Sequence, residues 1–348
     1  MRVTHVVPVT PKRCGMYETA RELVVAERAA GVDAWLYDPR PPKPGPDPKG
    51  EGGTPPWTED RGACVAPLHW ALGSDVIVSH SGLDERFDAS PAPRVHVAHG
   101  RPNSSYRIEA GGETPIYSMY SRFAKDPRWK LMVTLWKGYE DYWRLLFPRV
   151  ASVPAWVDLD HWRPGPVDGY WGEKAGRPNV LICDLWRMDK DPFYPLHACA
   201  LLARALPRMR VHVLGCGPNP KGRGAILDGL ARLGVLGQVA GMLPDLRPAY
   251  MSADVMITPH RIATRTVREA LASGCQVVAA AGNPYTPYTA DPEDLPTYAA
   301  QVLHAWDDLR ENRPVRRAAN RAVAEKEFDL GRAAGAFLNL LETVKGAV

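Results

Sequence analysis

The chain has 348 residues, which is more than one hydrophobic core usually fills, so we expect two domains. With 45% hydrophobic and 24% charged residues, its composition is that of an ordinary globular protein rather than a disordered or fibrous one. The net charge of +4 permits an anionic partner without requiring one.

Hydropathy and cysteine usage exclude further classes. No apolar run approaches the ~20 residues needed to cross a bilayer, so we expect no membrane span. The first residues lead directly into a predicted strand, without the pattern of a secretory signal. The six cysteines are scattered and form no C-x-x-C pair, which argues against a disulfide framework or a zinc site. We therefore expect a cytoplasmic protein with reduced thiols.

In the first half of the chain, short apolar runs alternate with a longer amphipathic stretch. The predicted elements are strand 3–7, helix 16–30, strand 32–37, strand 75–79 and strand 95–98. Glu27 interrupts the apolar stripe of the helix. Residues 39–57 are too rich in proline and glycine for a packed element and are expected to form an exposed loop. The alternation predicts a mostly parallel sheet flanked by helices.

The segment 152–164 breaks this pattern, and a second alternation of strands and helices follows it. The predicted strands are 180–183, 210–214, 239–240, 254–258 and 276–280, and the predicted helices are 195–206, 225–233, 246–252 and a helical tail over 295–348. We therefore expect an α/β protein with two similar domains, residues 1–164 and 165–330. A C-terminal helix over 331–348 is a candidate to pack back on the first domain.

The stretch 259–278, PHRIATRTVREALASGCQVV, is the most informative part of the chain. It joins two predicted strands through a polar loop and a short helix, which aims a helix N-terminus at the carboxyl edge of a parallel sheet. The free N–H groups there suit a phosphate, and a carboxylate one turn further on suits sugar hydroxyls. The residues at and around this helix start are Arg261, Thr264, Arg265, Thr266 and Glu269. Diphosphate and ribose are what a nucleotide sugar presents.

Four segments, taken in order, resemble a GT-B glycosyltransferase of the family-4-like, retaining group. They are 153–164 (VPAWVDLDHWRP), 211–218 (VHVLGCGP), 250–255 (YMSADV) and 268–278 (REALASGCQVV). They resemble the family's interdomain segment, its Gly-rich turn beneath the donor nucleotide, its Y-x-x-A-D-V motif and its E-A-x-A-x-G-x-P-V-V motif. The resemblance covers nearly the whole chain. It implies two Rossmann-like domains facing each other across a cleft, and a metal-independent hexosyltransferase that uses a nucleotide-diphosphate sugar, with a UDP-sugar as the first choice.

The resemblance implies roles for residues of the second domain. Arg187 and Lys190 match the donor-site pair that neutralises the leaving diphosphate, although they are three positions apart where the family has about five. Glu269 matches the ribose-binding carboxylate. Arg261 stands where the family usually has a second glutamate, so a phosphate contact and a solvated loop residue remain open for it. The alternative for Arg187 and Lys190 is an ordinary surface position, and for Glu269 it is a helix residue near an N-terminus, where acidic side chains are favoured.

The resemblance also involves glycines and histidines at strand ends. Gly215 and Gly217 belong to the turn beneath the donor nucleotide, and Gly15 closes the first strand-to-helix loop near the donor phosphates. His99 follows a strand and matches the histidine that contacts the donor sugar at the reaction centre. His80 also ends a strand and is a candidate for the acceptor side. A plain turn or a structural histidine is the alternative for each.

Metal and cofactor signals are poor. Asp158 and Asp160 form a D-x-D pattern, but it lies inside the interdomain motif and is interpreted as structural. His96 and His99 are three apart on a strand and should face opposite ways. The sequence has no P-loop, and the turn at 215–217 lacks the third glycine of a dinucleotide fingerprint. We expect no metal and no cofactor other than the donor substrate.

Residues 101–149 suggest an acceptor surface. They carry nine basic and five acidic side chains with aromatic residues between them, beginning at Arg101, an acceptor-side candidate. Basic side chains for phosphates and flat rings for unstacked bases describe a nucleic-acid surface. The alternative is a set of amphipathic helices whose rings are core and whose charges are solvated.

The segments HGRPNSSYR and TPHRIATRTVREAL resemble glycosyltransferases of phage-like genomes. Some of these enzymes glycosylate hydroxymethylated pyrimidines in DNA. DNA is therefore one candidate acceptor, and the host cytoplasm would then be the location. A glycan, a lipid or a small molecule is the alternative. Two further hypotheses are other chemistry on a nucleotide sugar, such as epimerisation or hydrolysis, and a non-catalytic nucleotide-sugar or DNA-binding module.

Overall fold

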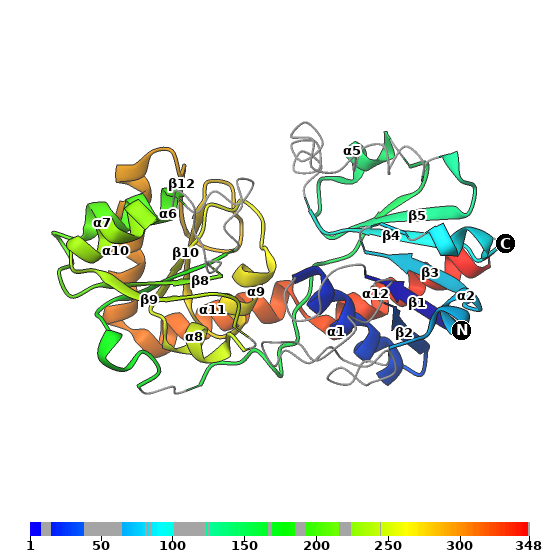
Figure 1. Ribbon diagram of the computed structural model, residues 1–348, viewed down its shortest axis with the longest axis horizontal. Helices are drawn as coiled ribbons and strands as arrows, with labels where there is room; N and C mark the ends of the chain where they lie inside the picture. Colours follow the sequence, from blue (N-terminus) through cyan, green and yellow to red (C-terminus); the bar gives the residue numbers. More distant parts are fainter. Residues whose placement is uncertain are drawn as a thin grey trace. The chain divides into compact units, whose positions relative to one another are not determined.

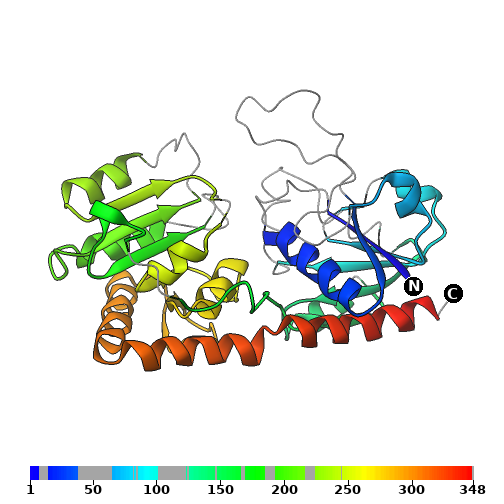
Figure 2. The same cartoon turned by 90° about the horizontal axis from the view of Figure 1, so that it is seen from below.

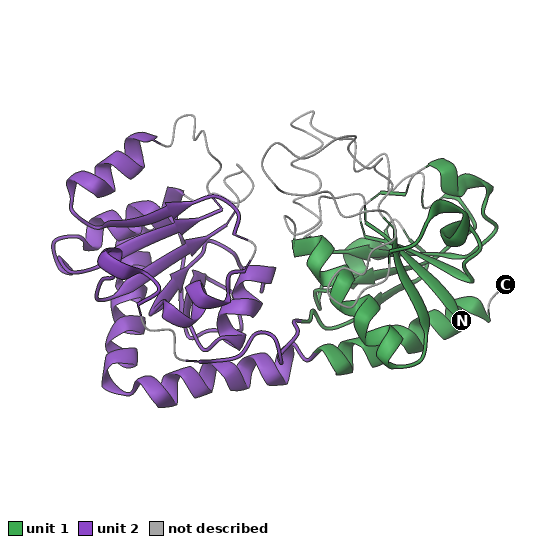
Figure 3. Ribbon diagram, turned by 60° about the horizontal axis from the view of Figure 1, so that its bottom comes forward, with its two compact units in different colours: residues 1–156, 330–348 green, residues 157–329 purple. Residues whose placement is uncertain are grey.

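The computed structural model divides the chain into two compact units, Met1–Trp156 with Leu330–Val348 and Val157–Asp329 (Figure 3). The structure describes residues 1–7, 15–37, 65–80, 82–83, 85–100, 123, 125–145, 147–165, 169–184, 193–215, 224–243 and 245–346. Each unit contains one six-stranded parallel sheet with helices packed on it. The predicted α/β fold class is thereby confirmed.

The sheet of the first unit has the strand order β2-β1-β3-β4-β5-β6, with every pair parallel (Figure 1). Its strands are β1 (Arg2–Val6), β2 (Asp33–Tyr37), β3 (Val76–Ser79), β4 (Arg94–Ala98), β5 (Trp129–Thr134) and β6 (Val150–Ser152). The central strands are buried along their length, which is why they read as short apolar runs in the sequence. Strand β2 lies on one side of β1, and the later strands β3 to β6 follow on the other side. The strand order therefore reverses between β1 and β3, which is the switch point of this sheet.

Helices of the first unit cover this sheet. They are α1 (Gly15–Ala29), α2 (Leu68–Leu72), the 3-10 helix η1 (Glu85–Ala89), α5 (Glu140–Arg144) and α12 (Leu330–Lys345). Helix α12, from the far end of the sequence, runs beside α1 and contacts β3 (Figure 2). Its buried face includes Ala333, Phe337 and Leu341. Glu27, which interrupts the apolar stripe of α1, is fully buried.

The sheet of the second unit has the strand order β12-β11-β10-β7-β8-β9, again with every pair parallel. Its strands are β7 (Asn179–Cys183), β8 (Arg210–Leu214), β9 (Leu236–Ala240), β10 (Val255–Ile257), β11 (Gln276–Ala280) and β12 (Tyr288–Ala290). The sequence did not predict β12, because Tyr288–Ala290 is short and lacks an apolar run. The switch point lies between β7 and β10.

The helices of the second unit are the 3-10 helix η2 (Gly172–Lys174), α6 (Phe193–Leu202), α7 (Gly224–Arg232), α8 (Arg247–Ser252), α9 (Arg265–Ala272), α10 (Leu295–Glu311) and α11 (Arg313–Glu327). The helical tail is divided where Asn312 caps α11, its Oδ1 accepting from the N–H of Val315 at 3.3 Å. Gly274 follows the C-cap residue of helix α9, and its φ of 79° is left-handed. A Cβ there would lie 3.3 Å from the backbone oxygen of Arg317, so glycine is required.

The division between the units falls after Trp156, eight residues before the predicted boundary at 164. Residues of the interdomain motif are held on the second unit, because the N–H of Val157 donates to the backbone oxygen of Phe328 at 3.0 Å. The Nη1 of Arg321 donates to the backbone oxygens of Leu159 and Trp162 at 3.0 and 2.5 Å. Asp158 Oδ1 accepts from the backbone N–H groups of Asp160 and His161 at 3.0 Å, which gives the D-x-D pattern a turn-forming role.

None of the helices described is long and apolar enough to cross a membrane. Within the same part of the chain, no three His, Cys, Asp or Glu side chains are grouped closely enough to hold a metal ion.

Candidate functional site

Two polar side chains meet at the switch point of the second sheet. Asp184 directly follows β7, and His260 lies three residues after the end of β10. The Nε2 of His260 is hydrogen bonded to the Oδ2 of Asp184, and the two side chains are only 9% and 10% exposed. Asn283 Nδ2 donates to the backbone oxygen of His260 at 3.2 Å, which ties the loop after β10 to the segment after β11. This is the carboxyl edge of the sheet, where open α/β folds bind ligands.

Helix α9 begins just after this loop, with Thr264 as its N-cap residue. The structure gives Thr264 no side-chain hydrogen bond to the first turn within the described part of the chain. The hydroxyl oxygens of Thr264 and Thr266 lie 3.0 Å apart, and both residues are half-buried, whereas Arg261 is exposed. The N–H groups of the first helical turn have no intrahelical partners, so this end of α9 suits an anion.

Glu269 lies inside α9 and is 4% exposed. Its Oε1 accepts from Nε of Arg265 at 2.5 Å, and its Oε2 accepts from the hydroxyl of Tyr250 at 3.2 Å. Arg265 and Glu269 form an i,i+4 ion pair with both side chains mostly buried. A carboxylate oxygen can accept more than one hydrogen bond. The sequence predicted Arg265 for a phosphate contact, and the structure shows its Nε bound to Glu269.

The hydroxyl of Tyr250 also lies 3.6 Å from Sγ of Cys183, the last residue of β7. Burial, followed by the proximity of Cys183 and Glu269, raises the pKa of Tyr250 well above its ordinary value. Burial raises the pKa of the Cys183 thiol to about 12. Cys183 is therefore a protonated thiol at neutral pH and is unsuited to act as a nucleophile.

Gly215 follows β8 at the same edge of the sheet. Its φ is 86°, a left-handed conformation that favours glycine, and its N–H donates to the backbone oxygen of Gly241 at 3.2 Å. Four predicted site residues, Arg101, Arg187, Lys190 and Gly217, lie outside the described residues. Gly15, predicted near the donor phosphates, is the exposed first residue of α1, and its backbone oxygen accepts from the Thr19 hydroxyl at 2.6 Å.

In the first unit, a line of hydrogen bonds runs from the interior to His99. His5 in β1 places its Nε2 2.8 Å from Oε2 of Glu27 and its Nδ1 2.9 Å from Nε2 of His80. His80 follows β3, and its Nδ1 lies 2.8 Å from Nε2 of His99, which follows β4. Glu27 and His5 are fully buried, His80 is 1% exposed and His99 is half-buried. We call these four residues the Glu27–His99 chain.

Burial lowers the pKa of His80 well below its ordinary value, and the proximity of His99 and His5 acts in the same direction. His80 is therefore neutral near pH 7. His96 is 1% exposed and packs beside Phe123, with 5.5 Å between ring centres, and burial lowers its pKa to about 3. His96 lies outside the line of hydrogen bonds that contains His99.

Sequence analysis did not identify several residues of these two groups as site residues: Glu27, His5, Cys183, Asp184, Tyr250 and His260. For some of them a signal existed. A glutamate in an apolar helix stripe and a histidine in an apolar strand are buried polar groups, and such groups need hydrogen-bond partners. Asp184 directly follows a predicted strand, a position that favours ligand contact in parallel sheets.

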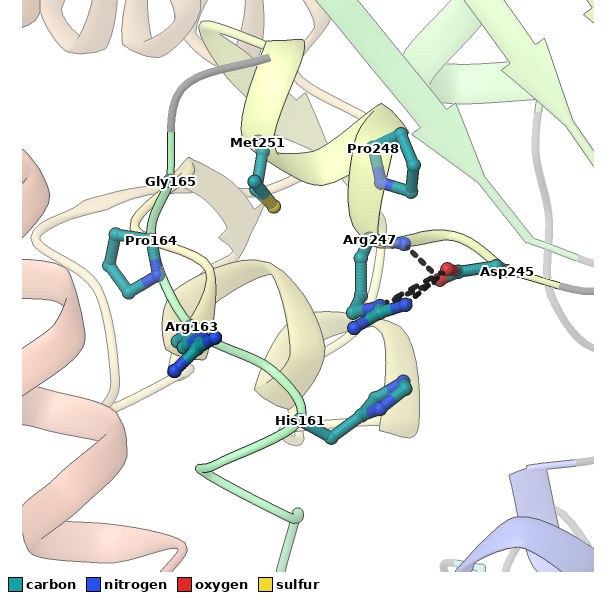
Figure 4. A pocket seen from close by; sticks show the side chains of 8 residues that line it. All are labelled: His161, Arg163, Pro164, Gly165, Asp245, Arg247, Pro248 and Met251. Atoms are coloured by element: carbon teal, nitrogen blue, oxygen red, sulfur yellow. Dashed lines mark hydrogen bonds and ion pairs between the residues drawn. The ribbon is translucent and has the colours of Figure 1, made fainter. Parts of the chain in front are cut away.

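A pocket of about 590 Å³ opens beside α8 in the second unit (Figure 4). Its lining residues are His161, Arg163, Pro164, Gly165, Asp245, Arg247, Pro248 and Met251. Asp245 and Arg247 form a bidentate pair in it, at 3.1 and 2.7 Å. Burial acts to raise the pKa of Asp245, but the hydrogen bonds and charge of Arg247 outweigh it and hold that pKa below its ordinary value. None of the predicted site residues lines this pocket, so the candidate site in the second unit is the carboxyl edge of its sheet instead.

The chain has the GT-B fold, as comparison with solved structures shows. Sucrose-phosphate synthase from Thermosynechococcus elongatus is 15% identical, with a TM-score of 0.75 and full coverage of both chains. HepE from Anabaena, solved with UDP and glucose, is 12% identical over 98% of this chain and 99% of its own, with a TM-score of 0.66. WaaG, a glycosyltransferase involved in lipopolysaccharide biosynthesis, is 14% identical over 96% and 98%, with a TM-score of 0.67.

Residues 179–308 match the family described as glycosyl transferases group 1. This segment runs from the start of β7 into α10, so it contains the switch point, α9 and the Arg265–Glu269–Tyr250 group. The match to this family therefore lies within the second unit. No curated protein matches the chain.

Proposed function

We propose that the protein is a retaining, metal-independent glycosyltransferase of the cytoplasm. It would move a sugar from a nucleotide-diphosphate sugar, with UDP-sugars as the first choice, to a hydroxyl acceptor. One observation carries this proposal: in the family-matched unit, the N-terminus of α9 and the buried Arg265–Glu269–Tyr250 group lie beside the switch point. The complex of HepE with UDP and glucose supports a donor of this class.

The donor would be bound by complementary charges. The N–H groups at the start of α9 suit the diphosphate, and Glu269 suits the ribose hydroxyls. Breaking the sugar–phosphate bond leaves negative charge on the leaving diphosphate, and fixed positive groups lower the barrier to this step. Arg187 and Lys190 are proposed to supply that positive charge. The proposal also assigns His99 to the donor sugar.

The acceptor proposal takes account of the described part of residues 101–149. Phe123, Trp129 and Trp143 are buried in one hydrophobic cluster of the first unit, so these rings are not a surface for bases. Arg128 forms an ion pair with Asp126 at 2.9 Å. We therefore favour a hydroxyl of a glycan, a lipid or a small molecule. A hydroxymethylated pyrimidine in DNA is the second candidate, because basic side chains exceed acidic ones by nine to five in this segment.

The first test is turnover with a panel of UDP-, GDP- and ADP-sugars, with hydroxymethylcytosine DNA, glycans and small alcohols as acceptors. We expect release of the nucleoside diphosphate with formation of a glycoside, unchanged by EDTA, as measured by mass spectrometry. Arg187→Ala or Lys190→Ala should lower kcat by roughly 100-fold or more, because each removes positive charge from the leaving group.

Arg232→Ala is the matched control, because Arg232 is an exposed cation of the same unit on α7. Its rate should equal that of the unsubstituted protein. Sugar conversion without an acceptor would support epimerisation or hydrolysis instead. Calorimetry that finds no binding of UDP, GDP or ADP would rule out the proposed function, and binding without turnover would favour a non-catalytic module.

A further inference from the structure

In the Glu27–His99 chain, the carboxyl group of Glu27 determines which nitrogen donates and which accepts in each hydrogen bond. A carboxylate oxygen can only accept, so with Glu27 ionised Nε2 of His5 is the donor across the 2.8 Å contact. A neutral imidazole has one N–H group, and Nδ1 of His5 is then its lone-pair nitrogen. That nitrogen can only accept, so Nε2 of His80 is the donor across the 2.9 Å contact.

The same reasoning applies to the next contact. Nδ1 of His80 accepts, and Nε2 of His99 donates across 2.8 Å. His99 is left with Nδ1 as its lone-pair nitrogen. We propose that Glu27, His5 and His80 are positioning residues that hold His99 as the Nε2–H tautomer, so that its Nδ1 accepts a hydrogen bond from a hydroxyl of the bound sugar. The identity of the ligand as a sugar rests on the proposed function; the tautomer does not.

The surroundings of the Glu27–His99 chain favour a neutral His80 and a fixed geometry. Burial, with the proximity of His99 and His5, keeps the pKa of His80 well below its ordinary value. Nε1 of Trp136 donates to the backbone oxygen of His99 at 3.0 Å, which fixes the end of β4. The ring of Phe337, from α12, lies 6.1 Å from that of His5 between ring centres and covers it.

Glu27 depends on His5. Oε1 of Glu27 has no hydrogen-bond partner among the described residues, and Oε2 is bonded to Nε2 of His5. An ionised carboxylate in a buried position needs compensation, and hydrogen bonds to it are stronger than those between neutral groups. The Nε2–H of His5 is therefore held toward Glu27. The buried charge of Glu27 thus determines which nitrogen donates at every contact of the Glu27–His99 chain.

The opposite direction requires one additional proton. His5 would then be an imidazolium ion, His80 would donate through Nδ1, and His99 would present an Nδ1–H group instead of a lone pair. The two states differ at each ring nitrogen of His80 and His99. Long-range proton–nitrogen correlation spectra of the full-length protein, labelled with ¹⁵N-histidine, distinguish them directly at pH 8.

We expect His5, His80 and His99 to show protonated Nε2 and unprotonated Nδ1, with each resonance assigned by single His→Gln variants. Glu27→Gln should remove the preference, because an amide can donate or accept, and His99 should then show both tautomers. Glu22→Gln is the matched control: Glu22 is also buried on α1 but lies outside the chain of hydrogen bonds. Its spectrum at His99 should be unchanged.

A spectrum with His99 as the Nδ1–H tautomer or as an imidazolium ion would overturn the proposal. So would a single unchanged tautomer of His99 in a folded Glu27→Gln protein, with folding checked by thermal unfolding. If Glu27→Gln fails to fold, His5→Gln breaks the line at its second member, and His99 should again show both tautomers.

A second arm measures catalysis and depends on the proposed function. Glu27→Gln should lower kcat by roughly tenfold or more with KM for the donor changed less, by analogy with carboxylates that fix a histidine tautomer in other enzymes. If Glu27→Gln removes the preference of His99 for the Nε2–H tautomer but leaves kcat unchanged, the Glu27–His99 chain does not contribute to catalysis. A protein without transferase activity but with the expected tautomers would contradict the proposed function alone.

Discussion

Buried polar residues are the most informative single positions in this protein. Glu27 is a poor member of an apolar helix stripe, yet it is fully buried, with its Oε2 hydrogen bonded to Nε2 of His5. His212, in β8, is another such residue and is fully buried. Each of these side chains is tolerated because its hydrogen bonds offset the cost of removing it from water.

His212 is held in one protonation state by its neighbours. The Oδ1 of Asn179 accepts from Nε2 at 3.1 Å, and the backbone N–H of Gln238 donates to Nδ1 at 3.1 Å. Its ring is stacked on Trp171, with 3.7 Å between ring centres. Burial, followed by the charges of Lys174 and Arg210, lowers the pKa of His212 to about 3. A proton on Nδ1 would also remove the bond from Gln238.

The lowered pKa of His212 should make the free energy of unfolding depend on pH. The unfolded chain binds a proton at His212 below about pH 6.5, and the native protein does so only near pH 3, so the free energy of unfolding falls as pH falls through this window. The contribution of His212 reaches about 1.4 kcal/mol per pH unit. His212→Gln should flatten the pH dependence by that amount, as measured by urea unfolding between pH 4 and 6. The control His304→Gln removes an exposed histidine and should leave the slope unchanged; equal slopes for both variants would contradict the assignment.

At the scale of the element, α9 combines the features on which the donor proposal rests. It starts at the carboxyl edge of the sheet with Thr264, and its one acidic residue, Glu269, is turned into the protein toward Tyr250. Its end is fixed by Gly274. The sequence predicted a short helix that starts near Thr264 or Thr266, because threonine is a common N-cap residue.

Glu269→Gln tests the role of this helix in nucleotide binding. Removing the negative charge weakens hydrogen bonds from ribose hydroxyls, so Kd for UDP should rise by roughly tenfold or more. The measurement is isothermal titration calorimetry with UDP alone. Glu325→Gln is a close control, because Glu325 also forms an i,i+4 pair with an arginine, Arg321, but is exposed on α11. If both variants bind UDP as the unsubstituted protein does, Glu269 does not contact the nucleotide.

At the scale of the whole molecule, the sequence predicted two α/β halves from local patterns, but not the contacts that hold each half together. Trp156 belongs to the first unit, since its Nε1 donates to the backbone oxygen of Thr19 at 3.0 Å, whereas Val157 is bonded to Phe328 in the second. Such contacts join residues far apart in sequence, and no local pattern reports them. The same limitation applies to the Glu27–His99 chain, which exists only because β1, β3 and β4 are neighbours. His80 and His99 were candidates because each follows a predicted strand, whereas their partner His5 is apparent only from the fold.

The assignment of α12 to the first unit gives a final prediction. Phe337 is fully buried on α12, beside His5 and α1, although it is more than three hundred residues from His5 in sequence. Phe337→Ala should lower the free energy of unfolding by about 3–5 kcal/mol, because it leaves a cavity in this core. Hydrogen exchange should increase in peptides from β1, β3 and α1. Asn339→Ala, at an exposed position of the same helix, should change stability by no more than about 0.5 kcal/mol. Exchange that increases only in peptides from 157–329 would show that α12 packs in the other unit.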